Sequence, residues 1–221
     1  MATQRTVPAP IPGTRVPMSY EEYLTLEGEV LHAEWVNGEV VVFMPPSSKH
    51  QILLFWLARV IGLFAEVFDL GDVHVAPLEM RATPGGPARE PDIFFVAREH
   101  RDRMTTQRLN GPADLICELI SPESVRRDQV EKLREYAAAG VREYWLFDSR
   151  PVPILPAWYR LTEAGTYAPL VPDADGRLHS TVLPGFWLDP AWLAQEPLPA
   201  PLAVLQKIAP QALRAALKDS E

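Results

Sequence analysis

Cysteine is almost absent from this 221-residue sequence, whose one thiol is Cys117. A single thiol cannot form a disulfide within the chain, and it cannot build a cysteine-rich zinc site. The sequence also has no run that approaches the roughly 18 uninterrupted apolar residues of a membrane span, and its first residues lack the apolar core of a signal peptide. We therefore expect a protein of the reducing cytoplasm that has no membrane partner.

Basic residues are fewer than acidic residues in this sequence, and lysine is especially rare. The net charge at pH 7 is −8, and 17 of the 21 basic residues are arginine. This balance disfavours a protein that coats nucleic acid generally, because phosphate binding needs a basic surface. It does not exclude an enzyme that has a local basic groove and a carboxylate-bound metal. The hydrophobic content of 47% and charged content of 23% are ordinary for a globular chain with one core.

Proline and capping residues divide the chain into three predicted parts. A proline-rich, weakly ordered arm covers 1–18, a folded domain covers 19–190, and two short helices separated by Pro210 make a C-terminal extension over 191–221. The first half of the domain is predicted to contain a capped helix at 20–27, a hairpin around Asn37-Gly38, a long helix at 49–68, a strand at 72–80 and a strand that starts near Pro91.

A strand, a helix and a second strand form the clearest unit of the sequence. The strand is predicted at 114–120, the helix at about 124–139, and the second strand at 142–148, with Gly140 as the left-handed residue that ends the helix. This spacing predicts a right-handed parallel crossover. The proline-broken segments after it predict an antiparallel meander. The expected fold class is therefore α/β (α+β), with a mixed central sheet flanked by helices.

Three charged residues are predicted to lie near strand ends, where functional groups tend to collect in such sheets. Asp92 opens one strand, Glu118 lies late in the apolar strand that follows, and Lys132 lies on the crossover helix. A buried glutamate without a partner costs several kcal/mol, roughly, or stays protonated. Two carboxylates on adjacent strands can share Mg²⁺, and a lysine ammonium beside them can orient or help deprotonate an attacking water.

Each of these residues also has a purely structural interpretation. Asp92 could be a turn residue at a strand entrance, and Glu118 could pair with Arg126 or Arg127 at an exposed strand end. Lys132 could form an ordinary helix ion pair four residues from Asp128, worth about 0.3–0.5 kcal/mol. The apolar positions on that helix predict that Lys132 lies at the flank of the buried stripe, whose members are Val130, Leu133 and Ala137.

The motifs taken together resemble the PD-(D/E)XK nuclease superfamily. The order is Pro91-Asp92, then Glu118-Leu119-Ile120, then the helix that carries Lys132. More narrowly, residues 18–190 are similar to a large bacterial family of restriction-endonuclease-like proteins of unknown function. The shared segments are SYEEYLTLEG, HAEWVNGEVV, SSKH, REPDIFFV, GPADLICELISPES and EKLREYAAAGVREYWLFD.

The resemblance implies a restriction-endonuclease-like core and a Mg²⁺-dependent endonuclease, with Mn²⁺ as the substitute ion and DNA as the transient partner. Asp92, Glu118 and the backbone carbonyl of Leu119 would hold the ion, and Lys132 would position the water. The superfamily lysine would stand at Ile120, so in this chain the lysine has moved to the following helix.

Four further residues complete the predicted site. Glu34 matches a family glutamate that could support a second metal, although a hairpin glutamate is otherwise expected to face solvent. His50 matches a family position at a helix start and could bind a phosphate or adjust the water of the metal, although a histidine at a helix start is usually just solvated. Arg126 and Arg127 are predicted to contact the substrate.

Two other classes of function stay open on the sequence alone. Ile120 in the lysine position and the charge of −8 also suit a weakly active or inactive nuclease-fold protein that serves as a nucleic-acid-binding or interaction module. The C-terminal segment could instead mediate a homodimer. Its apolar positions are Leu202, Leu205, Ile208, Leu213 and Leu217.

Overall fold

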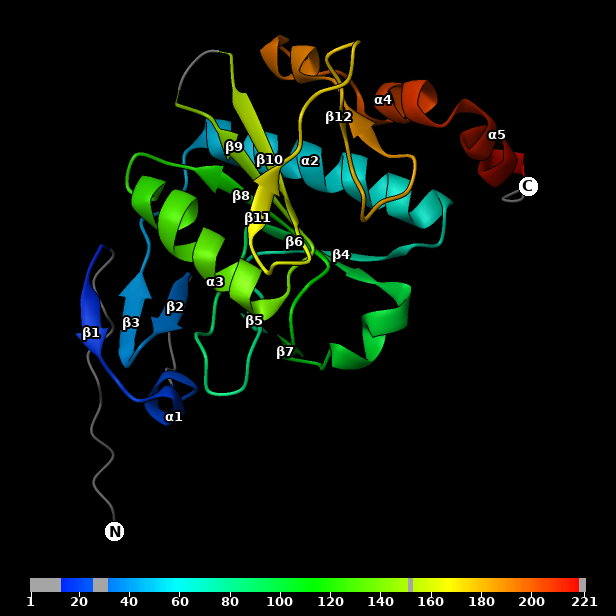
Figure 1. The fold of residues 1–221 in the computed structure, drawn as a ribbon. Coiled ribbons are helices and arrows are strands. Elements are labelled where there is room, and N and C mark those ends of the chain that lie inside the picture. The colour runs from blue at the N-terminus through cyan, green and yellow to red at the C-terminus, as the bar shows by residue number, and fades with distance from the viewer. Residues whose placement is uncertain (1–12, 26–31, 151–152, 219–221) are drawn as a thin grey trace.

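A computed structural model describes residues 13–25, 32–150 and 153–218 of the chain (Figure 1). The strands are β1 Arg15–Pro17, β2 Ala33–Val36, β3 Glu39–Val42, β4 Gly71–Val75, β5 Glu79–Arg81, β6 Ile93–Ala97, β7 Arg108–Asn110, β8 Leu115–Ile120, β9 Glu143–Asp148, β10 Leu155–Leu161, β11 Tyr167–Pro169, β12 Leu178–His179 and β13 Trp187–Leu188. The α-helices are α1 Tyr20–Tyr23, α2 Ser48–Val67, α3 Lys132–Ala139, α4 Pro201–Ile208 and α5 Pro210–Lys218. Shorter helical segments are the 3₁₀ helices η1 Arg98–Arg103 and η3 Pro190–Ala194 and the π-helix η2 Arg127–Glu131.

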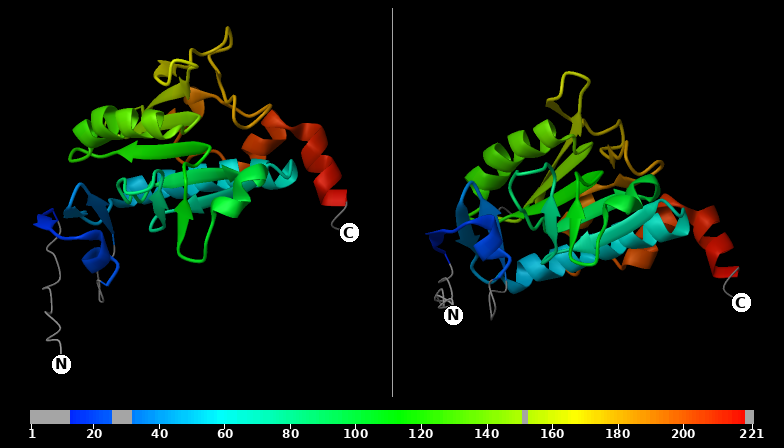
Figure 2. Two further views of the ribbon diagram at one scale, coloured as in Figure 1. Left: turned by 60° about the horizontal axis from the view of Figure 1, so that its bottom comes forward. Right: turned by 90° about the horizontal axis from the view of Figure 1, so that it is seen from below.

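A six-stranded mixed sheet forms the centre of the fold, in the order β11-β10-β9-β8-β6-β4. β8 and β9 pair in parallel, as the predicted crossover requires, and the other neighbours pair antiparallel. Helix α3 covers one face of this sheet and helix α2 covers the other (Figure 2). The predicted mixed sheet flanked by helices is therefore confirmed.

Strand β8 lies in the middle of this sheet and is buried along its whole length. Alternate residues, Cys117 among them, enter the large core shared with α2, and Ile116 and Ile120 enter the smaller core beneath α3. A strand covered on both faces has no polar alternation, which explains the nearly continuous apolar run. Glu118 is the exception on the α3 face, and it is only 3% exposed.

Helix α2 begins where Ser47 accepts a hydrogen bond from the backbone N–H of His50, as the predicted cap requires. Among the described residues it is the one helix long and apolar enough to cross a bilayer, with a mean hydropathy of 1.4. Seven of its residues are nevertheless buried in the core. The C-terminal helices pack against it, with Leu205 and Leu213 in the same core and Leu202 and Leu217 exposed.

A second, three-stranded sheet, β1-β3-β2, carries the predicted hairpin with positive φ at Asn37 and Gly38. Its edge strand β2 is joined to the main domain by a two-way backbone bridge between Trp35 and Ala88. The predicted arm ends earlier than expected, because Arg15–Pro17 pairs with β3, and its residues 1–12 lie outside the described part.

Three predicted elements differ in detail. The strand expected at 72–80 is divided into β4 and β5, because Pro77 has no N–H to continue a ladder. The short helix α1 ends at Tyr23, not at 27, and the crossover helix opens with the π-helical turn η2. Gly140 ends that helix with φ of 87°, as predicted.

Gly71 is required at the start of β4, where its φ is 152°. A Cβ atom there would lie 2.1 Å from the carbonyl oxygen of Val96, on the neighbouring strand. We expect Gly71→Ala to lower the free energy of unfolding by roughly 2 kcal/mol or more, because neither backbone can yield without breaking the ladder.

The matched control is Gly62→Ala in the middle of α2, where a new Cβ would meet nothing within 4 Å. This change should raise the free energy of unfolding by about 0.5–1 kcal/mol through helix propensity. Urea denaturation of both variants measures the difference. If both substitutions changed the free energy of unfolding by the same amount and in the same direction, close packing at Gly71 would not explain the effect of Gly71→Ala.

Candidate active site

Asp92 and Glu118 are brought together by the register of two adjacent strands. Ile93 of β6 pairs with Cys117 of β8 in antiparallel fashion, so one further step places Asp92 opposite Glu118. Residues that face each other in this way lie on the same face of a sheet, with Cβ atoms about 4.5–5.5 Å apart. The side chain of Asp92 also accepts a hydrogen bond of 2.7 Å from the backbone N–H of Leu119, which fixes its orientation.

Lys132 reaches this pair from helix α3, although it is separated from Glu118 by 14 residues. Its Nζ lies 2.7 Å from Glu118 Oε1, 3.0 Å from Glu34 Oε1 and 3.9 Å from Asp128 Oδ1. Its residue exposure is only 2%. The hydroxyl of Tyr136 donates a second hydrogen bond of 3.1 Å to the same oxygen of Glu118.

The buried face of α3 differs from the predicted one. Asp128, Lys132 and Tyr136 point inward, whereas Val130 is 40% exposed. These three residues are spaced by four and therefore share one face of the helix. Their polar groups are buried by contacts with one another and with Glu118. Lys132 therefore lies at the centre of the buried stripe, and its expected place at the flank was wrong.

Glu34 is buried against cations and does not face solvent as a hairpin residue would. It is 1% exposed. Its Oε2 accepts a hydrogen bond of 2.9 Å from Arg89, and its Oε1 contacts Lys132 and accepts from the backbone N–H of Glu90. Both oxygens are thus engaged by the protein, and a role for Glu34 at a second metal stays a prediction.

Charge and burial act in opposite directions on the ionisable groups of this cluster. Burial and neighbouring carboxylates raise the pKa of Glu118 to about 8, although the Lys132 ammonium opposes this. Burial also disfavours ionised Asp92, but the hydrogen bond and charge of His50 hold its pKa below the usual value. Burial alone would lower the pKa of Lys132, and the charges of Glu118 and Glu34 outweigh it, so that its pKa lies above the usual value.

The predicted substrate contacts occupy the edge of the cluster. His50 Nε2 lies 3.7 Å from Asp92 Oδ1, and its side chain is 13% exposed, so it is not simply solvated. Arg126 is 87% exposed and pairs with Glu131. Arg127 pairs with the side chain of Asp128 at 3.3 Å and stacks on Phe43. Neither arginine is the partner of Glu118, so that structural interpretation was wrong.

The family described as putative restriction endonuclease, Uma2, matches residues 20–191, which is well over half of the chain. The chain belongs to the Uma2 family. This finding confirms the resemblance that the motifs indicated, and family and fold together place the protein among nuclease-type proteins.

One protein is similar to this chain in sequence, and one solved structure is similar to it in fold. The uncharacterized protein sll1609 of Synechocystis sp. is 25% identical over 133 residues, which cover 58% of this chain and 72% of that protein. The crystal structure of a putative nuclease belonging to DUF820 from Anabaena variabilis has a TM-score of 0.64 at 17% identity and covers 80% of this chain and 98% of that one. At this identity the likeness concerns the fold.

The buried acids of this Uma2 protein could hold a divalent cation. Four buried carboxyl groups, those of Glu34, Asp92, Glu118 and Asp128, face two buried cations and the partly exposed Arg127. Such an excess of buried acid is balanced by protons or by a bound cation. Within the described residues no three histidine, cysteine or acidic side chains converge as a metal-binding group, but Mg²⁺ needs only one or two carboxylates and keeps its waters.

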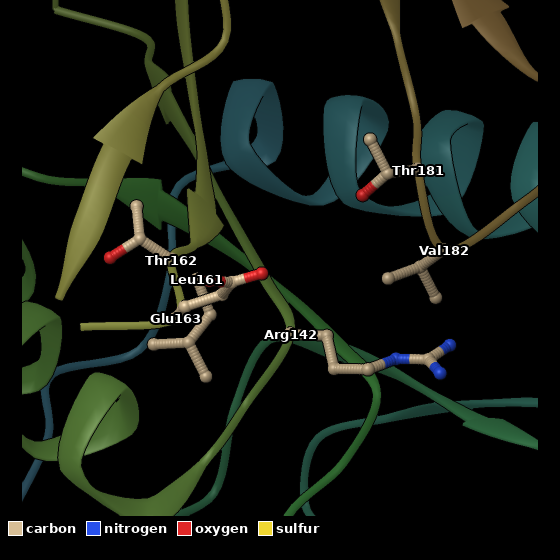
Figure 3. Close-up of a pocket in the computed structure, with 6 residues that line it drawn as sticks. All are labelled: Arg142, Leu161, Thr162, Glu163, Thr181 and Val182. Carbon is tan, nitrogen blue, oxygen red and sulfur yellow. The ribbon is translucent and has the colours of Figure 1, made fainter. Parts of the chain in front are cut away.

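Two hollows of the described surface lie away from this cluster. One has a volume of about 390 Å³ and lies between the end of β10 and the segment that follows β12 (Figure 3). Its lining residues are Arg142, Leu161, Thr162, Glu163, Thr181 and Val182. Asp92, Glu118 and Lys132 are not among them, and each of the three is at most 8% exposed.

Two residues of the cluster had no role in the sequence predictions for this Uma2 chain, namely Arg89 and Glu135. The guanidinium of Arg89 donates to both oxygens of Glu135 at 2.6–3.2 Å and also to Glu34. A signal was present, because Arg89 stands in the REPD segment that carries Asp92, and Glu135 follows Lys132 by three residues. The sequence does not show that the hairpin bearing Glu34 packs against both Arg89 and the crossover helix.

Proposed function

We propose that this protein is a Mg²⁺-dependent endonuclease that hydrolyses phosphodiester bonds in DNA. Asp92, Glu118 and the carbonyl of Leu119 would hold the ion, which polarises the phosphate and lowers the pKa of a water molecule when bound. The observation that carries the proposal is the contact of 2.7 Å between Lys132 Nζ and Glu118 Oε1 in a buried cluster. In the proposal this ammonium takes the role of the superfamily lysine, whose motif position is filled by Ile120.

Each side chain has a separate role in the proposed reaction. The N–H of Leu119 holds Oδ2 of Asp92, which leaves Oδ1, 3.7 Å from His50 Nε2, for the ion. Within the described residues, both hydrogen bonds to Glu118 end on Oε1, which leaves Oε2 for the ion. Because its pKa is raised, Lys132 stays an ammonium at neutral pH. It would therefore orient the attacking water and stabilise charge on the phosphate, and not act as the base.

DNA would be held by groups at the rim of the site. Arg126 is almost fully exposed beside the first turn of the crossover helix, and His50 approaches Asp92 from the start of α2. These groups would supply hydrogen-bond donors to phosphate at the edge of the site, on a chain whose net charge is −8.

The closed state of the cluster supports a second candidate. Asp92 is 8% exposed and Glu118 is 3% exposed, so a protein with this fold could bind nucleic acid or a partner subunit without cleaving DNA. A homodimer stays a prediction. The two exposed leucines of the C-terminal helices, Leu202 and Leu217, are the positions of that segment that could contact another subunit.

Cleavage of supercoiled plasmid by the purified chain, with Mg²⁺, with Mn²⁺ and with EDTA, tests the proposal. We expect cleavage that depends on the ion and a loss of about 10²–10³-fold in Glu118→Gln, because one carboxylate ligand is gone. Glu163→Gln, an exposed residue far from the cluster, is the control and should cleave normally.

Calorimetry with Mn²⁺ separates the two candidates. Binding at millimolar ion that weakens in Glu118→Gln supports the nuclease. DNA binding without cleavage, together with no heat of metal binding, would assign the interaction module instead.

A further inference from the structure

Arg89 occupies a rigid position between the hairpin sheet and the main domain. Its backbone exchanges two hydrogen bonds with Met80 of β5, and the preceding residue, Ala88, exchanges two with Trp35 of β2. Its side chain is 4% exposed. A guanidinium that is held from both sides and removed from water has little freedom, and its partners are correspondingly well defined.

The contacts of Arg89 lead in steps to the candidate catalytic lysine. The guanidinium forms a fork on Glu135 of α3 and donates through Nη1 to Oε2 of Glu34, at 2.9 Å. The other oxygen of Glu34 lies 3.0 Å from Lys132 Nζ, and that ammonium lies 2.7 Å from Glu118. The series therefore connects four separate segments of the chain through alternating charges.

We propose that Arg89 is a positioning residue for Lys132, acting through Glu34. This inference rests on the proposed function for its catalytic meaning. Lys132 has two close carboxylates and a more distant one, Asp128 at 3.9 Å. Arg89 keeps Glu34 ionised and oriented, and Glu34 in turn holds the ammonium towards Glu118. Without Arg89, one oxygen of a buried carboxylate loses its partner, and Lys132 can turn towards Asp128.

The kinetic test uses Arg89→Met in the full chain. We expect kcat for DNA cleavage with Mg²⁺ to fall by about 10- to 100-fold, as is common when a residue behind a catalytic site is removed. The KM for DNA should not change, since Arg89 touches no surface that DNA could reach. Arg101→Met is the matched control, because Arg101 forms a similar fork on the carboxylate of Asp72 at the exposed surface.

A double variant tests whether Arg89 acts through Glu34. If it does, Glu34→Gln and Arg89→Met combined should lower kcat about as far as the more severe single change. Losses that multiply would show that Arg89 acts independently of Glu34 and would overturn the proposal.

Amine labelling supplies a measurement that does not require activity. The chain has four lysines, and Lys132 is buried while Lys49, Lys207 and Lys218 are exposed. Mild acetylation followed by mass spectrometry should find Lys132 protected in the unsubstituted protein. In Arg89→Met its labelling should rise about tenfold relative to the other three.

Arg89→Lys is the second variant, in case the methionine variant does not fold. It keeps the positive charge, but an ammonium cannot join Glu34 and Glu135 as a fork does, so kcat should still fall and Lys132 labelling should still rise. A change in Tm alone, with kcat and labelling unchanged, would reduce Arg89 to a structural residue and overturn the proposal. An unsubstituted protein that cleaves no DNA with either ion would refute the proposed function, and the labelling would still decide whether Arg89 positions Lys132.

Discussion

Asp92→Asn is expected to lower the rate of DNA cleavage by on the order of 10³-fold while leaving the fold intact. The change removes one charged oxygen at the place where the ion would bind. The amide oxygen of asparagine can still accept the hydrogen bond from Leu119 that orients the side chain. Because the buried cluster has more acids than bases, the loss of one negative charge should change the free energy of unfolding by less than about 1 kcal/mol.

Two measurements check this result. Plasmid cleavage gives the rate, and calorimetry with Mn²⁺ should show that metal binding is lost together with cleavage. Asp72→Asn is the matched control, since Asp72 is 45% exposed on β4 and pairs only at the surface with Arg101. Survival of both metal binding and cleavage in Asp92→Asn would remove Asp92 from the site.

Lys132→Met is expected to destroy cleavage and also to destabilise the protein by about 3–5 kcal/mol. The substitution keeps most of the length of the side chain but removes the ammonium between Glu118 and Glu34. Those two carboxyl groups would then be buried with a mutual repulsion that Arg89, Tyr136 and the backbone N–H of Glu90 only partly offset. A loss of both stability and activity distinguishes Lys132 from an exposed helix lysine, whose ion pair would be worth less than about 1 kcal/mol.

Urea denaturation and plasmid cleavage measure the two effects separately. Lys218→Met, in the last turn of α5, is the control, because Lys218 is exposed and lies on a different helix. Stability within about 0.5 kcal/mol of the original protein would contradict the buried network described for Lys132.

Local patterns predicted most of the elements. The Asn37-Gly38 turn, the Ser47 cap and the Gly140 helix end each depend on residues within a few positions of one another, and the structure has all three. The parallel pairing of β8 and β9 followed in the same way, because the connection between them is long enough for a helix. Where local chemistry was misjudged, as at Pro77, a single residue without an N–H explains the break.

The site was predicted in part. The sequence indicated Asp92 and Glu118 through their places on two strands, and the pairing of Ile93 with Cys117 is the register that brings them opposite. The direction of Lys132 could not be read from the apolar positions of its helix. Its inward direction depends on Glu118 and Glu34, which lie on other segments of the chain and contact its ammonium.

The sequence by itself determined the order of elements, the nuclease-type motifs and the acidic character of the site. Only the tertiary structure decided that Arg89, Glu34 and Lys132 meet, because each lies on a different segment and the three are separated by 43 to 98 positions. Periodicity reports which residues avoid water, and it predicts a charged residue to be exposed. Here the charges are buried because they balance one another at close range, and such balance exists only after the segments have packed.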